Sequence, residues 1–207
     1  MERYCLFFMM VFAVTAALTA CTPSEQSTKT SPSLTFYSCR LGTLSMAVEC
    51  ATLDVPLKRD DPAHKEKISL RVIRLPANTP HPASDPFVML AGGPGQAASA
   101  LAPFAAAQVE IRRTRDILLI DQRGTGQSAP LQCATLDDAD DTTLRNSLTL
   151  EIVSRVQCCH EELREQNRDP LDYGTLHFVA DLDDVRRALG VNAINVWAGS
   201  YGTRVAL

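Results

Sequence analysis

The chain has 207 residues, of which 45% are hydrophobic and 21% charged, as in an ordinary globular protein with one domain's worth of core. This composition excludes the disordered and fibrous classes. The formal net charge of −4 shows no excess of basic residues, so no nucleic-acid partner is expected.

Residues 1–20 have the pattern of a secretory signal peptide. Arg3 precedes an apolar stretch that ends at Leu18 and is followed by small residues. This stretch is shorter than the roughly 20 residues that span a bilayer, which favours a cleaved signal over a membrane helix. Leu18–Cys21 resembles a bacterial lipobox, and the resemblance implies cleavage before Cys21 and lipid attachment to its thiol. The alternative is a soluble secreted protein in which Cys21 has no such role.

Residues 21–34 are polar and punctuated by proline, which is typical of a flexible tether. We therefore expect a signal peptide at 1–20, a tether at 21–34 and a folded part at 35–207. The protein would be exported to the bacterial periplasm or cell envelope and anchored to the membrane by lipid on Cys21.

Export changes the meaning of the cysteines, because an oxidising compartment lets them pair. Cys39 and Cys50 bracket a short segment and are the natural first disulfide. Cys133 is expected to pair with Cys159, because residues 150–165 have a helical apolar stripe that includes Cys159, whereas Cys158 points to the charged side. No second ligand pair has zinc-site spacing, so no metal is expected. The stripe consists of Ile152, Val156, Cys159 and Leu163.

Three strands are predicted before residue 121. Lys67–Arg74 alternates apolar and polar residues, which indicates one wet face and a place near a sheet edge. Phe87–Ala91 and Ile117–Ile120 are continuously apolar, as in central parallel strands covered on both faces. Between them, the alanine-rich segment Gln96–Arg112 is predicted to be helical.

A helix and a strand are predicted near the end of the chain. Phe178–Leu189 has an apolar stripe, with Gly190 as a left-handed cap, and Ala193–Trp197 is an apolar strand. Asp181 falls among the polar positions of that helix. The alternation of strands and helices predicts an α/β fold with a mostly parallel, doubly wound sheet.

The first chemical motif, Gly92-Gly93-Pro94-Gly95, directly follows a predicted buried strand. Acyl transfer places negative charge on a carbonyl oxygen, and glycines let backbone N–H groups approach that oxygen closely. Gly93, or its neighbour Gly92, is the candidate donor. The alternative is a glycine-proline turn without a ligand.

The second motif, Asp121–Ser128, follows the strand that ends at Ile120. Its glycines lack the spacing of a dinucleotide fingerprint, so no nucleotide cofactor is expected. Asp121 and Arg123 are predicted to form a structural ion pair that shapes the loop. A direct contact of these residues with substrate is the alternative.

The third motif, Ala198–Gly202, places Ser200 between small residues after a strand, which is the pattern of a nucleophile elbow. The amide of Tyr201 is the candidate second donor to the oxyanion. All four histidines (His64, His81, His160 and His177) precede Ser200, and only seven residues follow it. We therefore expect the catalytic machinery to be incomplete and the fold to be truncated after the elbow.

These three motifs in this order resemble the prolyl-aminopeptidase-like branch of the α/β-hydrolases, especially secreted tripeptidyl aminopeptidases. The resemblance covers about Phe36–Leu207, including Cys50–Leu57. Ala198 replaces the first glycine of the family's elbow, and Ala91 stands where related peptidases often carry histidine. No residue matches the acidic cap residues or the triad aspartate and histidine of the family.

The resemblance implies an exported serine peptidase that releases amino acids or short peptides from peptide N-termini through Ser200 without a cofactor. We expect residues 21–207 alone neither to hydrolyse peptides nor to fold stably. The alternatives are an esterase or lipase and a non-catalytic, lipid-anchored binding module. The sequence record is either part of a longer gene, the product of a frameshift or early stop, or such a module. Peptide specificity and oligomeric state stay open.

Overall fold

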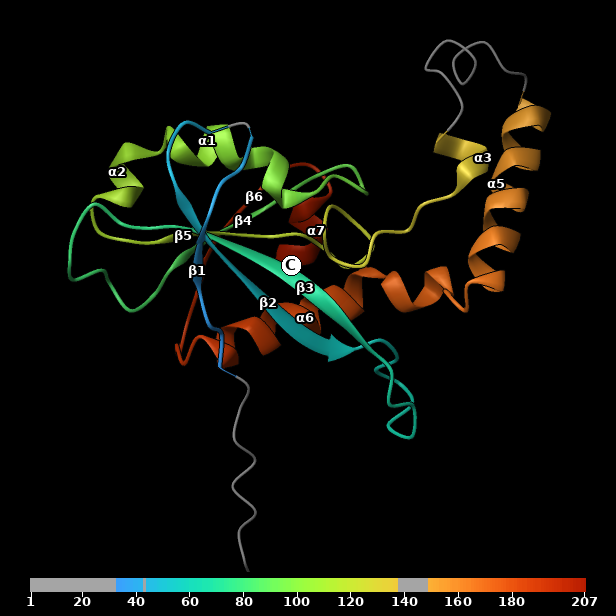
Figure 1. The fold of residues 1–207 in the computed structure, drawn as a ribbon, viewed down its shortest axis with the longest axis horizontal. Coiled ribbons are helices and arrows are strands. Elements are labelled where there is room, and N and C mark those ends of the chain that lie inside the picture. Colours follow the sequence, from blue (N-terminus) through green and yellow to red (C-terminus); the bar gives the residue numbers. More distant parts are fainter. Residues whose placement is uncertain (1–32, 43, 138–148) are drawn as a thin grey trace, which may run out of the picture. The chain divides into compact units, whose positions relative to one another are not determined.

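The computed structural model describes residues 33–42, 44–137 and 149–207. Its centre is a mixed sheet with the strand order β1-β2-β3-β5-β4-β6 (Figure 1). The strands are β1 (Tyr37–Cys39), β2 (Val48–Pro56), β3 (Lys67–Leu75), β4 (Phe87–Leu90), β5 (Ile117–Ile120) and β6 (Asn195–Ala198).

The functional motifs follow the parallel part of this sheet. β4 lies between β5 and β6 and is parallel to both, with Val88 opposite Leu118 on one side and Val196 on the other. β1, β2, β3 and β5 pair in antiparallel fashion. All four residues of β5 are buried, as the apolar run predicted. The α/β fold class is confirmed.

The sequence predicts that β3 lies near a sheet edge, whereas it is an interior strand, the third of the six described strands. β3 lies between β2 and β5, with Val72–Leu75 paired to β5 and Lys67–Arg74 paired to β2. The alternation of Lys67, Ile68, Ser69 and Leu70 reflects an exposed and a buried face of this strand. Such alternation reports on faces of a sheet and carries no information on whether a strand has one neighbour or two.

Helices cover both faces of the sheet. Ala98, Ala102 and Ala105 pack on one face against Met89 and Leu119. Helices α6 and α7 pack on the other face, and Figure 1 shows α6 on the opposite side of the sheet from α1 and α2. The segments involved are the 3-10 turn η1 (Ala98–Leu101), α1 (Ala102–Ala106), α2 (Val109–Arg112), α6 (Thr175–Ala188) and α7 (Gly202–Ala206).

Two predicted helices differ in detail from the structure. The segment predicted at 96–112 is interrupted at Gln108, whose ψ of 63° is not helical, so α1 and α2 are separate. Helix α6 begins at Thr175, and Gly190 has the positive φ of 71° expected for its cap. Asp181, expected among the polar positions, is fully buried in α6.

Helix α5 (Thr149–Glu165) forms as predicted but does not bury its whole apolar stripe. Leu163 is buried, whereas Val156 is 52% exposed. α5 contacts the short helix α3 (Ala134–Asp137), where the Thr135 hydroxyl donates to the Glu162 carboxylate (Figure 1). In the described part of the chain, no helix is both long and apolar enough to cross a membrane.

Candidate functional site

Ser200 lies in a sharp turn between β6 and α7. Its φ is +51°, an uncommon conformation for a non-glycine residue, and it is exposed. The turn closes through hydrogen bonds from the Gly202 N–H to the Gly199 carbonyl (2.9 Å) and from the Thr203 N–H to the Ser200 carbonyl (3.1 Å). The strand, strained serine and helix have the geometry of a nucleophile elbow.

Gly202 lets α7 begin directly against the end of β4. A Cβ atom on Gly202 would stand 2.7 Å from the carbonyl oxygens of both Leu90 and Ala91. The Gly199 N–H also donates to the Leu90 carbonyl, at 3.4 Å. These backbone contacts place the elbow beside the loop that follows β4.

The glycine-proline loop meets Ser200 directly. A Cβ atom on Gly92 would lie 3.5 Å from the Ser200 Oγ atom. Gly93 and Gly95 have φ values of +99° and +98°, which side chains disfavour. Within residues 33–42, 44–137 and 149–207, the N–H groups of Gly93 and Tyr201 donate to no protein acceptor. Gly93 lines the same cavity as Ser200, and Tyr201 directly follows Ser200 in the chain, so both residues with these N–H groups belong to the neighbourhood of the serine.

A cavity of about 280 Å³ opens beside Ser200. Gly92 and Gly93 line one part of it, and Leu101, Gln96 and Trp197 line another. The Trp197 ring also contacts the Phe104 ring, with their centroids 5.2 Å apart. The wall next to the serine is therefore largely apolar.

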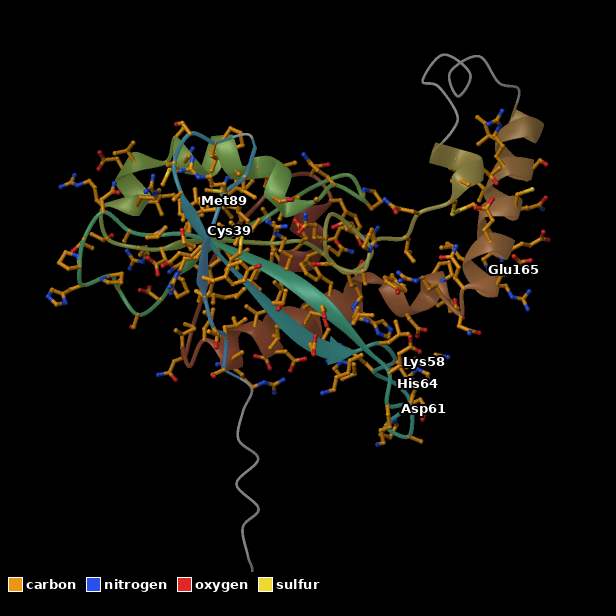
Figure 2. The ribbon with its side chains drawn as sticks, in the orientation of Figure 1. Cys39, Lys58, Asp61, His64, Met89 and Glu165 are labelled. Atoms are coloured by element: carbon orange, nitrogen blue, oxygen red, sulfur yellow. A yellow bond between two sulfur atoms is a disulfide. The ribbon has the colours of Figure 1, made fainter. Side chains whose placement is uncertain are left out.

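All four histidines of the chain lie in the described residues, and none of these histidines contacts the Ser200 hydroxyl. His64 lies beside Lys58 and Asp61 on the connection between β2 and β3 (Figure 2), with its Nε2 atom 3.3 Å from Glu66. His177 is 3.9 Å from Asp60. The described site holds a candidate nucleophile and two donors without a general base.

Asp121 is fully buried at the end of β5 and organises the neighbouring loop. Its carboxylate accepts hydrogen bonds from the Ser99 N–H (2.7 Å), the Ser99 hydroxyl (3.2 Å) and the Gln127 N–H (3.2 Å). These bonds connect the β5 loop to the segment that follows the glycine-proline loop. The predicted ion pair between Asp121 and Arg123 is therefore wrong.

Arg123 pairs with Asp181 of α6 instead. Its Nε and Nη2 atoms each donate to the Asp181 carboxylate at 2.7 Å. The remaining N–H groups donate to the carbonyls of Pro56 (3.1 Å), Leu57 (2.9 Å) and Asp172 (2.7 Å). All five guanidinium donors are satisfied, so one buried side chain joins the β2 end, the β5 loop and α6.

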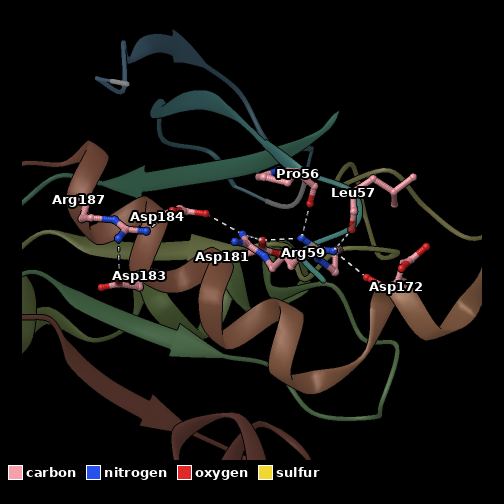
Figure 3. A network of polar contacts seen from close by, with 9 residues as sticks. Pro56, Leu57, Arg59, Asp172, Asp181, Asp183, Asp184 and Arg187 are labelled. Carbon is pink, nitrogen blue, oxygen red and sulfur yellow. Dashed lines mark hydrogen bonds and ion pairs between the residues drawn. The ribbon is translucent and has the colours of Figure 1, made fainter. Parts of the chain in front are cut away.

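A second arginine continues this network to the surface. Arg59 contacts Asp181 and donates to Asp184 at 2.7 Å, and Arg187 contacts Asp184 (Figure 3). Burial is the largest single influence on the pKa of Arg59 and lowers it. The hydrogen bonds and charges of the two aspartates outweigh burial and raise that pKa above its ordinary value. Arg59 is thus a permanent cation at the edge of the network.

Sequence reasoning missed one contact of the elbow and the burial of Asp181. The hydroxyls of Thr175 and Tyr201 form a hydrogen bond that joins α6 to the elbow. No local pattern indicates this bond. The burial of Asp181 could have been predicted from the sequence, because Phe178, Asp181 and Val185 have the spacing of residues on one face of a helix.

The two predicted disulfides are confirmed. Cys39 is bonded to Cys50 and Cys133 to Cys159, and Cys158 is a free, exposed thiol. Such bonds are typical of proteins that fold in an oxidising compartment. Cys21 lies outside the described residues, as do the predicted signal peptide and most of the tether. No group of three or more potential metal-binding side chains occurs in the part of the chain that the structure covers.

Residues 85–207 match the sequence profile of the alpha/beta hydrolase fold. The chain belongs to this family. The match includes the glycine-proline loop, the Asp121 loop and the Ser200 elbow, which agrees with the position of all three at one edge of the parallel strands.

Two curated relatives have different activities in their names. Serine protease Hip1 of Mycobacterium tuberculosis (strain ATCC 25618 / H37Rv) is 30% identical over 170 residues, which cover 75% of this chain and 32% of Hip1. Carboxylesterase B of the same strain is 32% identical over 154 residues, which cover 67% of this chain and 28% of the esterase. The chain spans 28% to 41% of the length of the curated relatives that it matches.

A solved structure also resembles this chain. The crystal structure of proline iminopeptidase from Mycobacterium smegmatis is 21% identical, with a TM-score of 0.43. The similarity covers 74% of this chain and 37% of that chain.

Proposed function

We propose that this chain contributes the nucleophile and the oxyanion site of a serine hydrolase. The observation that carries the proposal is Ser200 at φ +51°, next to the Gly92 loop, with the N–H groups of Gly93 and Tyr201 nearby and without a protein acceptor among the described residues. The Ser200 oxygen attacks a carbonyl carbon and forms a tetrahedral intermediate. The N–H groups of Gly93 and Tyr201 donate to the oxyanion, as such preorganised donors do in acyl transfer.

The attacking hydroxyl needs a base to accept its proton, and an imidazole oriented by an acid performs this step in serine hydrolases. No histidine of the described residues reaches Ser200. We therefore propose that the 207 residues alone do not turn over substrate, and that a histidine and an acid in the natural gene product complete the site. No metal or organic cofactor takes part in the proposed reaction.

Peptides are the proposed substrates, in particular short peptides cleaved near their N-terminus. The protease relative, together with the order of the Gly92–Gly95, Asp121–Ser128 and Ala198–Thr203 motifs, supports this choice. The second candidate is an esterase, which the equally similar carboxylesterase favours. The same nucleophile and donors serve both reactions, because both pass through a tetrahedral oxyanion.

The test uses the protein expressed from its natural gene, alongside its Ser200→Ala variant. A serine-reactive phosphonate should label the natural protein at Ser200 and leave the variant unlabelled. Turnover of peptide arylamides in preference to aryl esters supports the peptidase, and the reverse preference supports the esterase. Turnover that survives Ser200→Ala contradicts the hydrolase proposal, and absence of both labelling and turnover favours the binding module.

We also propose export and lipid attachment at Cys21. The two disulfides and the lipobox-like segment Leu18–Cys21 support this location. Metabolic labelling with a radioactive fatty acid, followed by membrane fractionation, tests the proposal. Cys21→Ala should lose both the label and the membrane association, whereas Cys158→Ser should keep both.

A further inference from the structure

We infer that Thr175 is a positioning residue for the Ser200 site and acts through Tyr201. This inference rests on the proposed function, in which the Tyr201 amide donates to the oxyanion. The Thr175 and Tyr201 hydroxyls share a hydrogen bond, and the two residues lie 26 positions apart in the chain. Thr175 is the first residue of α6, and Tyr201 directly follows the nucleophile.

The elbow has two attachments of different kinds. On one side, the elbow is attached to the end of β4 through its backbone: the Gly199 N–H donates to the Leu90 carbonyl, and Gly202 lies so close to β4 that an added Cβ atom would stand 2.7 Å from the Leu90 and Ala91 carbonyl oxygens. On the other side, the Tyr201 side chain packs at the edge of the core and is fixed at its tip by Thr175. The direction of the Tyr201 N–H depends on the backbone dihedrals on either side of it. A side chain held at both ends limits those dihedrals, so the bond to Thr175 limits the direction of the amide.

Thr175 can serve as an anchor because α6 is itself fixed. Asp181 lies six residues further along the helix, about 9 Å along its axis, and is fully buried. It is held by both Nε and Nη2 of Arg123 and by Arg59. Sliding or rotating α6 would break these charged hydrogen bonds in the interior, which is costly. The position of Thr175 is therefore determined by the network in Figure 3.

This arrangement links the buried arginine to the reaction site. Arg123 holds Asp181, Asp181 fixes α6, Thr175 begins α6, and Thr175 holds Tyr201. The direction of the Gly93 N–H group does not depend on α6, because Gly93 belongs to the loop that follows β4. Loss of the Thr175 hydroxyl should therefore weaken one of two donors, lowering the rate of the chemical step and leaving substrate binding unchanged.

The experiment measures kcat and KM for the natural gene product and four variants: Thr175→Val, Thr175→Ser, Tyr201→Phe and the double variant Thr175→Val/Tyr201→Phe. Thr175→Val should lower kcat about tenfold and leave KM unchanged, since a small displacement of a catalytic group has effects of this order.

Thr175→Ser keeps the hydroxyl group and should therefore have most of the kcat of the natural protein. The double variant should be no slower than the slower single variant, because both remove the same bond. Thr52→Val, at an exposed position of β2, is the matched control.

Several results would overturn the inference. An unchanged kcat in Thr175→Val with a lowered melting temperature would show that the bond serves packing alone. If Thr175→Val does not fold, a full kcat in Tyr201→Phe would have the same meaning. Failure of the proposed function is a separate result, since it appears as turnover that persists in Ser200→Ala whatever the Thr175 variants do.

Discussion

Gly92 lies directly beside Ser200 although 108 positions separate them: a Cβ atom added to Gly92 would stand only 3.0 Å from the Cβ atom of Ser200. They meet because β4 and β6 are adjacent parallel strands, and the loops after such strands lie at the same edge of the sheet. Each loop carries one N–H group, that of Gly93 or Tyr201, with no protein acceptor among the residues that the structure describes.

Gly92→Ala should reduce phosphonate labelling of Ser200 in the natural gene product by roughly 10- to 100-fold. The added methyl group would also stand 3.3 Å from the Gly199 carbonyl, so either the loop or the serine must move. Labelling rates from intact-protein mass spectrometry measure the effect. Gly42→Ala is the matched control, because its added methyl group would have no atom of the described residues within 4 Å apart from its neighbours in the chain. Equal labelling of Gly92→Ala and the natural protein would contradict the proposed geometry.

Gly202→Ala should lower the free energy of unfolding by about 1–3 kcal/mol, the usual cost of forcing extra volume into a packed site. The methyl group would lie 2.7 Å from two backbone carbonyl oxygens, and backbone cannot move aside as a flexible side chain can. Urea unfolding provides the measurement. Gly174→Ala, whose methyl group would meet the nearest atom at 3.5 Å, should cost less. Equal costs for the two variants would argue against close contact between α7 and β4.

Arg123→Met should cost about 3–5 kcal/mol of unfolding free energy, because it leaves the buried Asp181 with one fewer charged partner. Arg123→Lys should also be strongly destabilising, since an ammonium group cannot donate to a carboxylate and three carbonyls at once. Arg113→Lys is the control, because the Arg113–Glu110 pair is exposed and contributes about 0–1 kcal/mol. Chemical denaturation compares them, and a neutral Arg123→Lys would refute the role of the five-donor arrangement.

Asp85→Asn should make stability less dependent on acid pH. Hydrogen bonds from Asn195 and Arg115 hold the pKa of the Asp85 carboxyl below its ordinary value of 3.8. The ionised carboxylate therefore stabilises the fold fully at pH values above the pKa of Asp85 in the unfolded state. This contribution to stability is lost as the pH falls through the lower pKa of Asp85 in the folded state. The melting-temperature difference between the natural protein and the variant should be constant down to about pH 4 and shrink below it. A difference that grows on acidification would contradict the assignment.

The sequence predicted the elements whose signals are local. Continuous apolar runs identified β4 and β5, and small residues around Ser200 identified the elbow. The disulfide between Cys133 and Cys159 was predicted correctly even though Val156, on the same stripe, is exposed. Helical spacing alone was sufficient to place Cys159, because a helix fixes the relative directions of its own side chains.

Contacts between distant segments were not predictable in the same way. Arg123 has an acidic neighbour at Asp121, yet its partner lies 58 residues away in α6. Asp121 instead accepts hydrogen bonds from backbone donors of η1 and of its own loop, a role that depends on how β4 and β5 are placed side by side. The bond between Thr175 and Tyr201 likewise requires the packing of α6 against the elbow. Sequence periodicity describes faces of elements, whereas these contacts depend on three-dimensional arrangement.

The disulfide between Cys39 and Cys50 has a mechanical consequence. β1 has three residues and one neighbour, so a pull from the N-terminal side would open its ladder one hydrogen bond at a time. The load then reaches Cys39, where a covalent bond transfers it to β2, a nine-residue strand in the interior of the sheet. A domain tethered from that end would resist tension through its crosslink, and unzipping from the edge would stop before the strands that carry the serine.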